Sequence, residues 1–305
     1  MSGGLPISGT QIALRHGQYA ADIATVGASL RTLSHDGRDL VVPFAEDEVR
    51  PLYRGAVLVP WPNRVVDGTY TFDGRTEQLP LTEPDRGHAL HGLACWSDYR
   101  VVARSASAVT LETEIVAQAG YPHRLRIEVE YRLEDDGLTT RVAATNTGPG
   151  RAPYGTSGHP YLVGGPGRVD DWTLELAADQ VLEVDQDRLI PTGLGAVASG
   201  PFDFAEPRRI GELFIDHAFT GLRASRARVV AADGRGAELR WDEGAPWVQV
   251  HTGDRPEPAY HRAGLAVEPM TCPPDAFNSG TDLIVLEPGA AHSVAWTIAA
   301  VGVSA

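Results

Sequence analysis

A strict alternation of apolar and charged residues over positions 125–133 limits most strongly what this chain folds into. Leu, Ile, Val, Tyr and Leu stand at every second position, and Arg or Glu fills each position between them. A period of two places one set of side chains on a buried face and the other in water, as in a β-strand. Asp136-Gly137 is a turn signal, and the alternation resumes over residues 138–144. These residues therefore predict an antiparallel hairpin.

The same alternation recurs at residues 109–115, 172–176 and 294–298. Turn signals punctuate the chain at Asp36-Gly37, Asp67-Gly68, Asp73-Gly74, Pro166-Gly167, Asp233-Gly234 and Pro288-Gly289. Many short strands with frequent glycine turns indicate an all-β sandwich or barrel. Helices are expected to be few and short, with a single turn at residues 274–278. No repeat, low-complexity tract or composition shift marks a linker, so residues 1–305 are expected to form one domain.

The charge balance narrows the classes of partner. The chain has 26 basic and 40 acidic residues, for a net charge of -14, and no basic run is longer than Arg208-Arg209. Nucleic acid and anionic membranes require clustered cations, so neither is an expected partner. Every basic residue is arginine, which excludes a Schiff-base lysine and the lysine of a phosphate-binding P-loop.

Cysteine content and the terminal sequence bear on location. Cys95 and Cys272 are too few for a CxxC motif or a disulfide framework, so two free thiols in a reducing compartment are expected, with a single disulfide left open. Residues 1–12 lack the basic start and apolar core of a signal peptide. No apolar run approaches the roughly 20 residues of a membrane span. A cytoplasmic protein is expected.

The segment at residues 155–161, Gly-Thr-Ser-Gly-His-Pro-Tyr, carries the first candidate functional residue. Segments rich in Gly, Ser and Pro form loops, where functional residues concentrate. His159 lies within it, and histidine is the side chain best suited to moving protons near neutral pH. A serine nucleophile of the G-x-S-x-G type would need glycine at position 159, so a serine hydrolase is disfavoured.

Further polar residues stand in four other segments. Asn63 and Arg64 follow a Pro-Trp-Pro run that stiffens the backbone. His88 and His91 are three residues apart, which on a strand turns them to opposite faces, and no third ligand is near, so no metal site is expected. The last two segments place Asp216 beside a histidine between apolar residues, and Glu268 at the end of an apolar run before proline. Each segment alone is also compatible with a purely structural role.

Taken in order, these segments resemble the aldose 1-epimerase (galactose mutarotase) family, in a form closest to a bacterial branch. The matching motifs span most of the chain, and they are Gly27-Ala28, residues 36–40, Pro62-Asn63-Arg64, Gly68-x-Tyr70-x-Phe72-x-Gly74, Leu90-His91-Gly92, Trp96, Gly120-Tyr121-Pro122, Tyr131-x-Leu133, Gly137-Leu138, Asn146, His159-Pro160-Tyr161, Asp216, Glu268-Pro269 and Pro288-Gly289.

The resemblance implies a large antiparallel β-sandwich with few short helices and a sugar pocket on one broad face. It implies that His159 is the general acid and Glu268 the general base of an enzyme that interconverts the α and β anomers of a hexose. Arg64, His91 and Asp216 would hold the sugar hydroxyls. Asn63 is a further candidate for binding the sugar, and His88 and Trp96 are candidates for lining the pocket, with an aromatic ring under a sugar face. No cofactor or metal is needed, since no redox change or group transfer occurs. A monomer or homodimer is expected.

Glutamate and histidine suit this reaction. A base takes the proton of the C1 hydroxyl and an acid protonates the ring oxygen, so that the ring opens, C1 rotates and the ring recloses. Ordinary pKa values of about 4.3 and 6.5 leave Glu268 charged and His159 partly protonated near pH 7, and opposite charges near one another favour both charged forms. The two groups are expected on opposite sides of the reacting centre.

Three other functions remain open. A non-catalytic carbohydrate-binding or sensor domain on the same fold needs hydroxyl ligands but no acid–base pair. A glycoside hydrolase typically uses two carboxylates about 5–10 Å apart, whereas the matched positions here hold histidine and glutamate. An epimerase for a phosphorylated or sulfonated hexose needs a cationic clamp, which without lysine must be arginine, with Arg64 or Arg86 as candidates.

Overall fold

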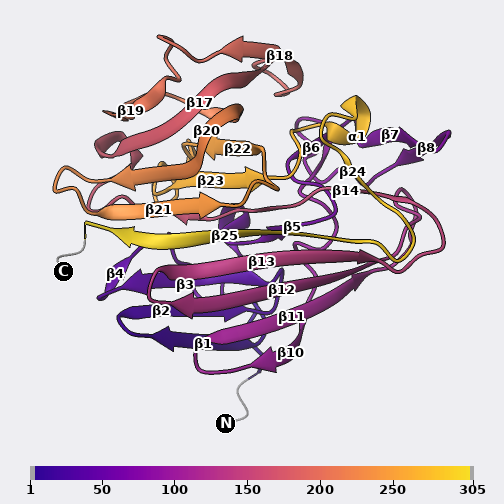
Figure 1. The fold of residues 1–305 in the computed structure, drawn as a ribbon, viewed down its shortest axis with the longest axis horizontal. Helices are drawn as coiled ribbons and strands as arrows, with labels where there is room; N and C mark the ends of the chain where they lie inside the picture. Colours follow the sequence, from indigo (N-terminus) through magenta and orange to yellow (C-terminus); the bar gives the residue numbers. More distant parts are fainter. Residues whose placement is uncertain (1–3, 303–305) are drawn as a thin grey trace.

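A long antiparallel sheet forms the backbone of the molecule (Figure 1). The structure, a computed structural model, describes residues 4–302. The sheet has 15 strands, and its main path runs β10 (Arg100–Arg104), β11 (Ala108–Ile115), β12 (Leu125–Glu134), β13 (Gly137–Asn146), β25 (Ala291–Val301), β21 (Gly236–Trp241), β20 (Asp216–Val230), β22 (Trp247–His251), β23 (Leu265–Met270), β15 (Ser157–Gly158) and β5 (Val57–Leu58).

Four further strands branch from this path. β16 (Tyr161–Leu162) pairs with β23, and β17 (Thr173–Val184) pairs with β20. β18 (Pro191–Ala196) and β19 (Phe204–Arg209) then pair with β17 and cover the end of the sheet that lies at the top of Figure 1.

The predicted hairpin is confirmed. β12 and β13 are antiparallel neighbours, with Glu134 opposite Gly137 at the turn. Burial alternates along β12 as its pattern predicts, because the apolar positions face the core and the charged positions face outward. The alternating segments near residues 109, 172 and 294 form β11, β17 and β25. The expected helical turn is α1 (Ala276–Ser279), and two 3-10 turns also occur, η1 (Pro51–Tyr53) and η2 (Val169–Asp171).

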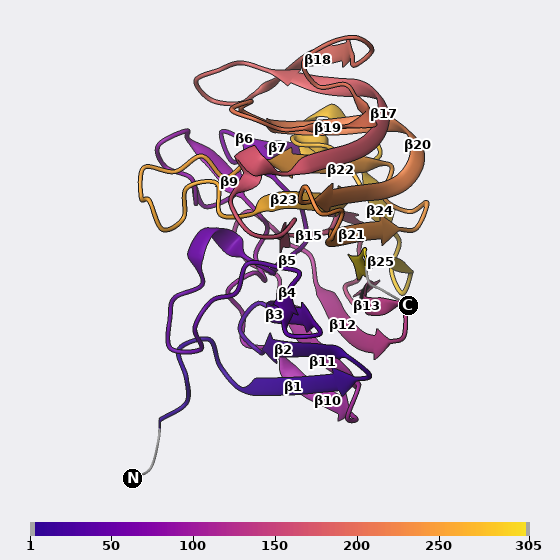
Figure 2. The same cartoon turned by 90° about the vertical axis from the view of Figure 1, so that its left-hand side faces the viewer.

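A second, four-stranded sheet makes the fold a sandwich at one end. It consists of β1 (Gln11–His16), β2 (Tyr19–Ala24), β3 (Ser29–His35) and β4 (Arg38–Asp39). β1 and β2 pack on β11 and β12, as Figures 1 and 2 show from two sides. Leu14, Ile23 and Leu33 of this sheet belong to the same hydrophobic core as Leu111 and Ile127 of the long sheet, and all five are fully buried. The expected all-β antiparallel sandwich is therefore confirmed.

Small two-stranded sheets connect the large ones. These are β6 (Arg64–Val66) with β9 (His88–Leu90), β7 (Thr69–Phe72) with β8 (Arg75–Gln78), and β14 (Ala152–Tyr154) with β24 (Ile284–Leu286). Asp275, just before α1, fixes β6: its backbone N–H donates to Arg64 O at 2.8 Å and its Oδ1 accepts from Val66 N at 2.9 Å. Cys95 and Cys272 are both buried and free. Within residues 4–302, none of the helices has the length and apolar character to cross a membrane.

Candidate active site

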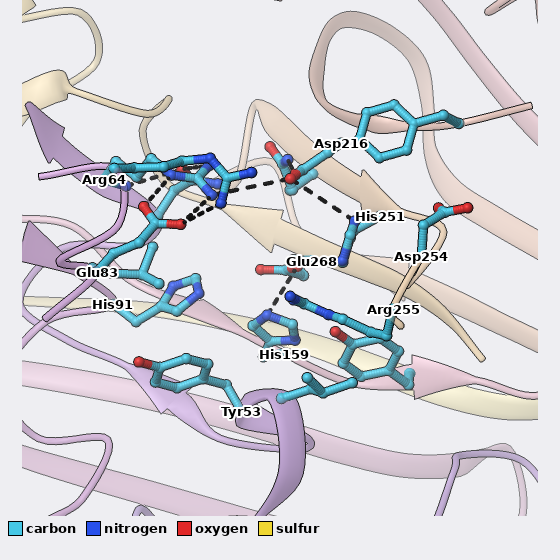
Figure 3. A pocket seen from close by; sticks show the side chains of 17 residues that line it. Tyr53, Arg64, Glu83, His91, His159, Asp216, His251, Asp254, Arg255 and Glu268 are labelled. Carbon is cyan, nitrogen blue, oxygen red and sulfur yellow. Dashed lines mark hydrogen bonds and ion pairs between the residues drawn. The ribbon is translucent and has the colours of Figure 1, made fainter. Parts of the chain in front are cut away.

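A polar cleft of about 680 Å³, including its open mouth, lies where β20, β22 and β23 face the β6–β9 pair (Figure 3). Small-molecule sites are typically concave and carry a few convergent polar groups, and the cleft has both features. His159, Glu268, Arg64, His91 and Asp216 all line it. The structure thus brings together residues that are up to about two hundred positions apart in the chain.

Strand register brings the first group of side chains together. Asp216 lies opposite His251 in the β20–β22 pair, and Gln249 lies opposite Glu268 in the β22–β23 pair. Because alternate residues of a strand share a face, Gln249 and His251 point to the same side. Asp216 is held by an N–H of Gln249, whose Nε2 donates to Asp216 Oδ1 at 2.7 Å. Three neighbouring strands therefore present one continuous polar surface.

His159 lies between β15 and β16, next to this surface. Its backbone N–H donates to Ala56 O at 2.9 Å, and its carbonyl accepts from Gly55 N at 2.8 Å. The residue before it, Gly158, lies flat against the ring of Trp296, and a Cβ at Gly158 would stand well inside contact distance of that ring. Packing therefore requires glycine at position 158. This packing also fixes the backbone position from which the His159 side chain extends.

A Gly158→Ala substitution should destabilise the fold and slow catalysis. The added methyl group must displace the Trp296 ring or the β15 backbone, and overpacking of this kind costs about 1–3 kcal/mol. Unfolding in urea should show that loss. If His159 has the catalytic role proposed below, turnover should fall at least about tenfold as well, since small shifts of a catalytic group are costly. Gly193→Ala on β18, where an added Cβ meets nothing within 4 Å, is the control. Equal stability and turnover in both variants would show that Gly158 does not position His159.

Arg64 and His91 reach the cleft from the β6–β9 pair. The backbone is left-handed at both places. Asn63, which precedes Arg64, has a φ of 53°, and His91 itself has a φ of 63°. The His91 N–H donates to Asn63 O at 2.8 Å, which ties the two strand ends together. Non-glycine residues rarely adopt a positive φ, and such strain concentrates at functional sites.

Glu83 forms a bidentate ion pair with Arg64. Arg64 Nε donates to Glu83 Oε2 at 2.7 Å and Nη2 to Oε1 at 3.0 Å. Arg86 Nη1 donates to the same Oε1 at 3.1 Å. Burial raises the pKa of Glu83 but its bonds to Arg64 lower it further, so the net shift is downward and the carboxylate stays charged. Both arginines considered for clamping an anionic sugar are thus already paired with a carboxylate.

His159 and Glu268 contact each other directly inside the cleft, with 3.4 Å between Nε2 and Oε1 (Figure 3). Burial lowers the pKa of His159 to about 3, and nearby His251 adds to the effect. Burial also raises the pKa of Glu268 well above its ordinary value, with a further contribution from the Asp216 charge and opposition from Arg64. Burial therefore favours the neutral form of both groups, with the shared proton on the carboxyl group rather than on the imidazole.

This charge state corrects the expectation that Glu268 is charged and His159 partly protonated. The mutual attraction of a charged pair is outweighed by desolvation, because side-chain exposure is only 6% for His159 and 2% for Glu268. The direct contact also replaces the expected placement on opposite sides of the reacting centre. The C1 hydroxyl oxygen and the ring oxygen of a sugar are bonded to the same carbon, so neighbouring groups can serve both.

These shifts predict opposite effects of the two groups on stability as pH changes. Between pH about 3 and 6.5 His159 takes up a proton only in the unfolded chain, so its contribution to stability rises with pH. Above pH 4.5 Glu268 keeps its proton only in the folded state, so its contribution falls with pH.

Urea unfolding at several pH values should therefore separate the two. Relative to wild type, His159→Gln should gain stability as pH falls below 6.5, and Glu268→Gln should gain stability as pH rises above 4.5. The slope for His159 is up to about 1.4 kcal/mol per pH unit. Differences that do not change with pH would mean that neither pKa is shifted by burial.

Several buried polar atoms in the cleft have no hydrogen-bond partner. They are His91 Nδ1, His159 Nδ1, Gln249 Oε1 and Glu268 Oε2. A buried polar group without a partner costs free energy, so such atoms need an explanation. The lining of the cleft carries both donors and acceptors for a ligand rich in hydroxyl groups. The arrangement is suited to binding a polyol such as a sugar.

Two tyrosines lie beside His159 and His91 in the cleft. The Tyr161 ring stacks on His159 with 5.3 Å between centroids, and the Tyr53 ring meets His91 edge-on at 4.6 Å. Leu52 and Tyr53 have positive φ values of 52° and 57° in the η1 turn. Two consecutive strained residues at the cleft wall indicate that the surrounding structure fixes Tyr53 in place.

Comparison with known proteins identifies the family. The sequence model described as Aldose 1-epimerase matches residues 10–298. The chain belongs to the aldose 1-epimerase family. Its class of enzyme is accordingly the isomerases, and the resemblance seen in the sequence motifs is confirmed.

Relatives of the family extend over nearly the whole chain. The uncharacterized protein YihR of Escherichia coli (strain K12) is 37% identical over 292 residues, which cover 95% of this chain and 93% of that protein. The galactose mutarotase of Rattus norvegicus is 31% identical over 275 residues, which cover 79% of this chain and 76% of that enzyme. The solved GalM/aldose epimerase homologue from C. elegans superposes with a TM-score of 0.84 at 22% identity, covering 95% of this chain and 98% of the other, and so shares the fold.

Two candidates for lining the pocket of this aldose 1-epimerase family member differ in their outcome. His88 is fully buried, and its Nδ1 accepts from Asp67 N at 3.3 Å while Nε2 faces Arg188 O at 2.9 Å, so both ring nitrogens are used outside the cleft. Trp96 is 48% exposed beside the cleft, where the Arg50 guanidinium covers its ring at 4.2 Å. The expectation for His88 is corrected, because contacts with residues distant in sequence occupy both ring nitrogens. The expectation for Trp96 stays a prediction. Asn63 does line the cleft.

Other cleft residues were not found from the sequence. They are Tyr53, Glu83, Gln249, His251, Asp254 and Arg255. Gln249 and His251 interrupt an otherwise apolar strand at a spacing of two, which is a readable sign of a polar face. Glu83 lies in a loop without any local motif, and only its contact with Arg64 reveals it.

Proposed function

We propose that this aldose 1-epimerase family member interconverts the α and β anomers of a hexose, with Glu268 as general base and His159 as general acid. The observation that carries the proposal is the 3.4 Å contact between the two groups, inside a cleft lined by polar side chains. The galactose mutarotases among the relatives support a hexose as substrate. We further propose that Arg64, His91, Asp216 and Asn63 hold sugar hydroxyls.

The reaction needs one proton to leave the substrate and one to arrive. Glu268 takes the proton of the C1 hydroxyl while His159 gives a proton to the ring oxygen O5. The C1–O5 bond breaks as C1 and O1 form a carbonyl, which yields the open-chain aldehyde. After rotation about C1–C2, O5 attacks the other face of C1, returns its proton to His159, and O1 takes back the proton from Glu268. Atoms and charge balance without any cofactor.

The single proton of the pair must move before this step. Burial favours the proton on Glu268, whereas the proposed reaction needs it on His159. Hydrogen bonds to a carboxylate favour its charged form, so sugar hydroxyls donating to the unpaired Oε2 of Glu268 would lower the pKa of that group. We propose that the proton then crosses the Nε2···Oε1 contact to His159. Substrate binding would thereby create the charged acid–base pair.

Optical rotation tests the proposal. Freshly dissolved α-D-galactose and α-D-glucose should each relax faster with the protein than in buffer, and reach the same final rotation. Absence of acceleration for both, combined with a sugar-induced rise in melting temperature, would favour the alternative of a binding or sensor protein. Absence of both effects would contradict binding of either sugar.

A further inference from the structure

Arg64 and Asp216 face each other in the cleft without a direct hydrogen bond (Figure 3). Arg64 Nη2 lies 4.0 Å from Asp216 Oδ2, whereas an N–H···O hydrogen bond measures about 2.7–3.2 Å. Side-chain exposure is only 10% for Arg64 and 15% for Asp216. Opposite charges attract each other more strongly away from water, so a gap between them requires that both side chains are held in place.

Glu83 holds the Arg64 side of the gap. Its carboxylate accepts from Arg64 Nε at 2.7 Å and from Nη2 at 3.0 Å, so it occupies the Nε–Nη2 edge of the guanidinium. Arg64 Nη1 adds a bond to Asn63 Oδ1 at 3.3 Å. Each terminal nitrogen of a guanidinium carries two N–H groups. The second N–H of Nη2 is therefore left for another partner.

The turn that carries Glu83 fixes the position of its carboxylate. The Glu83 N–H donates to His88 O at 3.0 Å, and the Glu83 carbonyl accepts from Gly87 N at 2.8 Å and from His88 N at 3.2 Å. His88 lies opposite Val66 in the β6–β9 pair, and β6 begins at Arg64. Glu83 and the arginine that it binds are therefore carried by one hydrogen-bonded backbone unit.

Gln249 holds the Asp216 side of the gap. Gln249 Nε2 donates to Asp216 Oδ1 at 2.7 Å, whereas no residue between 4 and 302 donates a hydrogen bond to Oδ2. Burial raises the pKa of Asp216, but nearby His251 and Arg64 lower it by more, so the net shift is downward and the carboxylate stays charged. Oδ2 is thus a charged acceptor that faces a free N–H across 4.0 Å.

The gap has the width that one hydroxyl group needs. An oxygen about 2.8 Å from both Nη2 and Oδ2 sees the two atoms at an angle of roughly 90°. A hydroxyl group both donates and accepts, so it can accept from Arg64 and donate to Asp216 at once. If Arg64 and Asp216 closed on each other, the same hydroxyl would have to break an ion pair before it could bind.

We propose that Glu83 is a positioning residue that holds Arg64 apart from Asp216, so that one hydroxyl of the sugar binds between the two. This inference rests on the proposed mutarotase function, in which Arg64 and Asp216 hold sugar hydroxyls. Glu83 acts through Arg64 in this role. A preformed gap favours binding, because no bond within the protein is lost when the hydroxyl enters.

The test measures what each sugar hydroxyl contributes to kcat/KM. Anomer exchange is followed by NMR for glucose or galactose, whichever the wild type accelerates more, and for its 2-, 3-, 4- and 6-deoxy forms. Wild type should lose about 10- to 100-fold on the deoxy sugar that lacks the bridging hydroxyl, the size expected for hydrogen bonds to charged groups. Glu83→Ala should lose a similar factor on the parent sugar and nothing further on that deoxy sugar. The intrinsic reactivity of each sugar cancels when variant and wild type are compared.

Three further variants complete the test. Asp216→Ala should abolish the penalty for the same deoxy sugar as Glu83→Ala does. Glu83→Gln keeps the size of the side chain and one acceptor oxygen, so it should show part of the effect, and it decides the test if Glu83→Ala does not fold. Glu112→Ala is the matched control, because it breaks a 2.7 Å ion pair with Arg100 between β10 and β11 and should behave as wild type.

The outcomes separate this inference from the proposed function. If wild type accelerates neither glucose nor galactose, both fail. If wild type is active but the Glu83 variants match it, or lower kcat/KM by the same factor for all five sugars, the inference is overturned and the mutarotase function stands. The inference also fails if Glu83→Ala and Asp216→Ala abolish the penalties of two different deoxy sugars.

Discussion

Glu268→Gln should lower kcat for mutarotation by about 10²–10⁴-fold, the range typical of a positioned acid or base. Glutamine keeps the size of the side chain and its place opposite Gln249 in the β22–β23 pair. It cannot take up or release the proton of the C1 hydroxyl, so only the chemical step is removed. Sugar affinity should stay within a few fold, because Arg64, His91 and Asp216 are unchanged. Polarimetry measures kcat, and isothermal titration calorimetry measures the affinity for the sugar.

The stability of the same variant provides a folding control. A buried carboxyl group with a raised pKa destabilises the folded state above pH 4.5, so Glu268→Gln should melt at a higher temperature than wild type at pH 7. Lost activity in a more stable protein points to chemistry and excludes misfolding as its cause. Glu243→Gln, on an exposed loop, should change neither property. Near-normal turnover in Glu268→Gln would remove Glu268 from the mechanism.

His159→Gln should cause a loss of similar size, about 10²–10⁴-fold in kcat. The glutamine amide reaches about as far as the imidazole Nε2, so it can still contact Glu268, but it cannot protonate the ring oxygen. KM should change little, since the hydroxyl ligands come from other strands. Steady-state kinetics by polarimetry over a range of sugar concentrations give kcat and KM separately.

His16→Gln is the matched control for this substitution. His16 lies on β1 in the four-stranded sheet and pairs with exposed Asp135, outside the cleft. It should leave kcat and KM at wild-type values. If His159→Gln instead raises KM and leaves kcat unchanged, His159 holds the sugar and another group is the acid.

Local pattern was enough to predict much of the fold. The β12–β13 hairpin follows from strict alternation and the Asp136-Gly137 turn, both of which lie within about twenty residues. The order of strands in the long sheet does not follow in the same way, because β25 at the chain end lies between β13 and β21. Pairings of this kind depend on contacts between distant segments, which carry no local signal.

The sequence predicted those site residues whose local motif also fixes the direction of the side chain. His91, with a left-handed backbone just after β9, lines the cleft, whereas both ring nitrogens of His88 in β9 are occupied by Asp67 and Arg188. The sequence holds both histidines but not these partners. Charge states were also beyond sequence reasoning, since the pKa values of His159 and Glu268 depend on how deeply the folded chain buries them.

Coupling between His159 and Glu268 tests the account most directly. The rates at which wild type, Glu268→Gln, His159→Gln and the double variant bring fresh α-D-glucose to its final rotation give a complete cycle. If the two groups pass one proton within a single unit, the double variant should be no slower than the slower single variant, within about threefold, since groups that act as a unit are non-additive. A double variant in which the two losses multiply would show that the groups act independently, and would contradict the shared-proton mechanism.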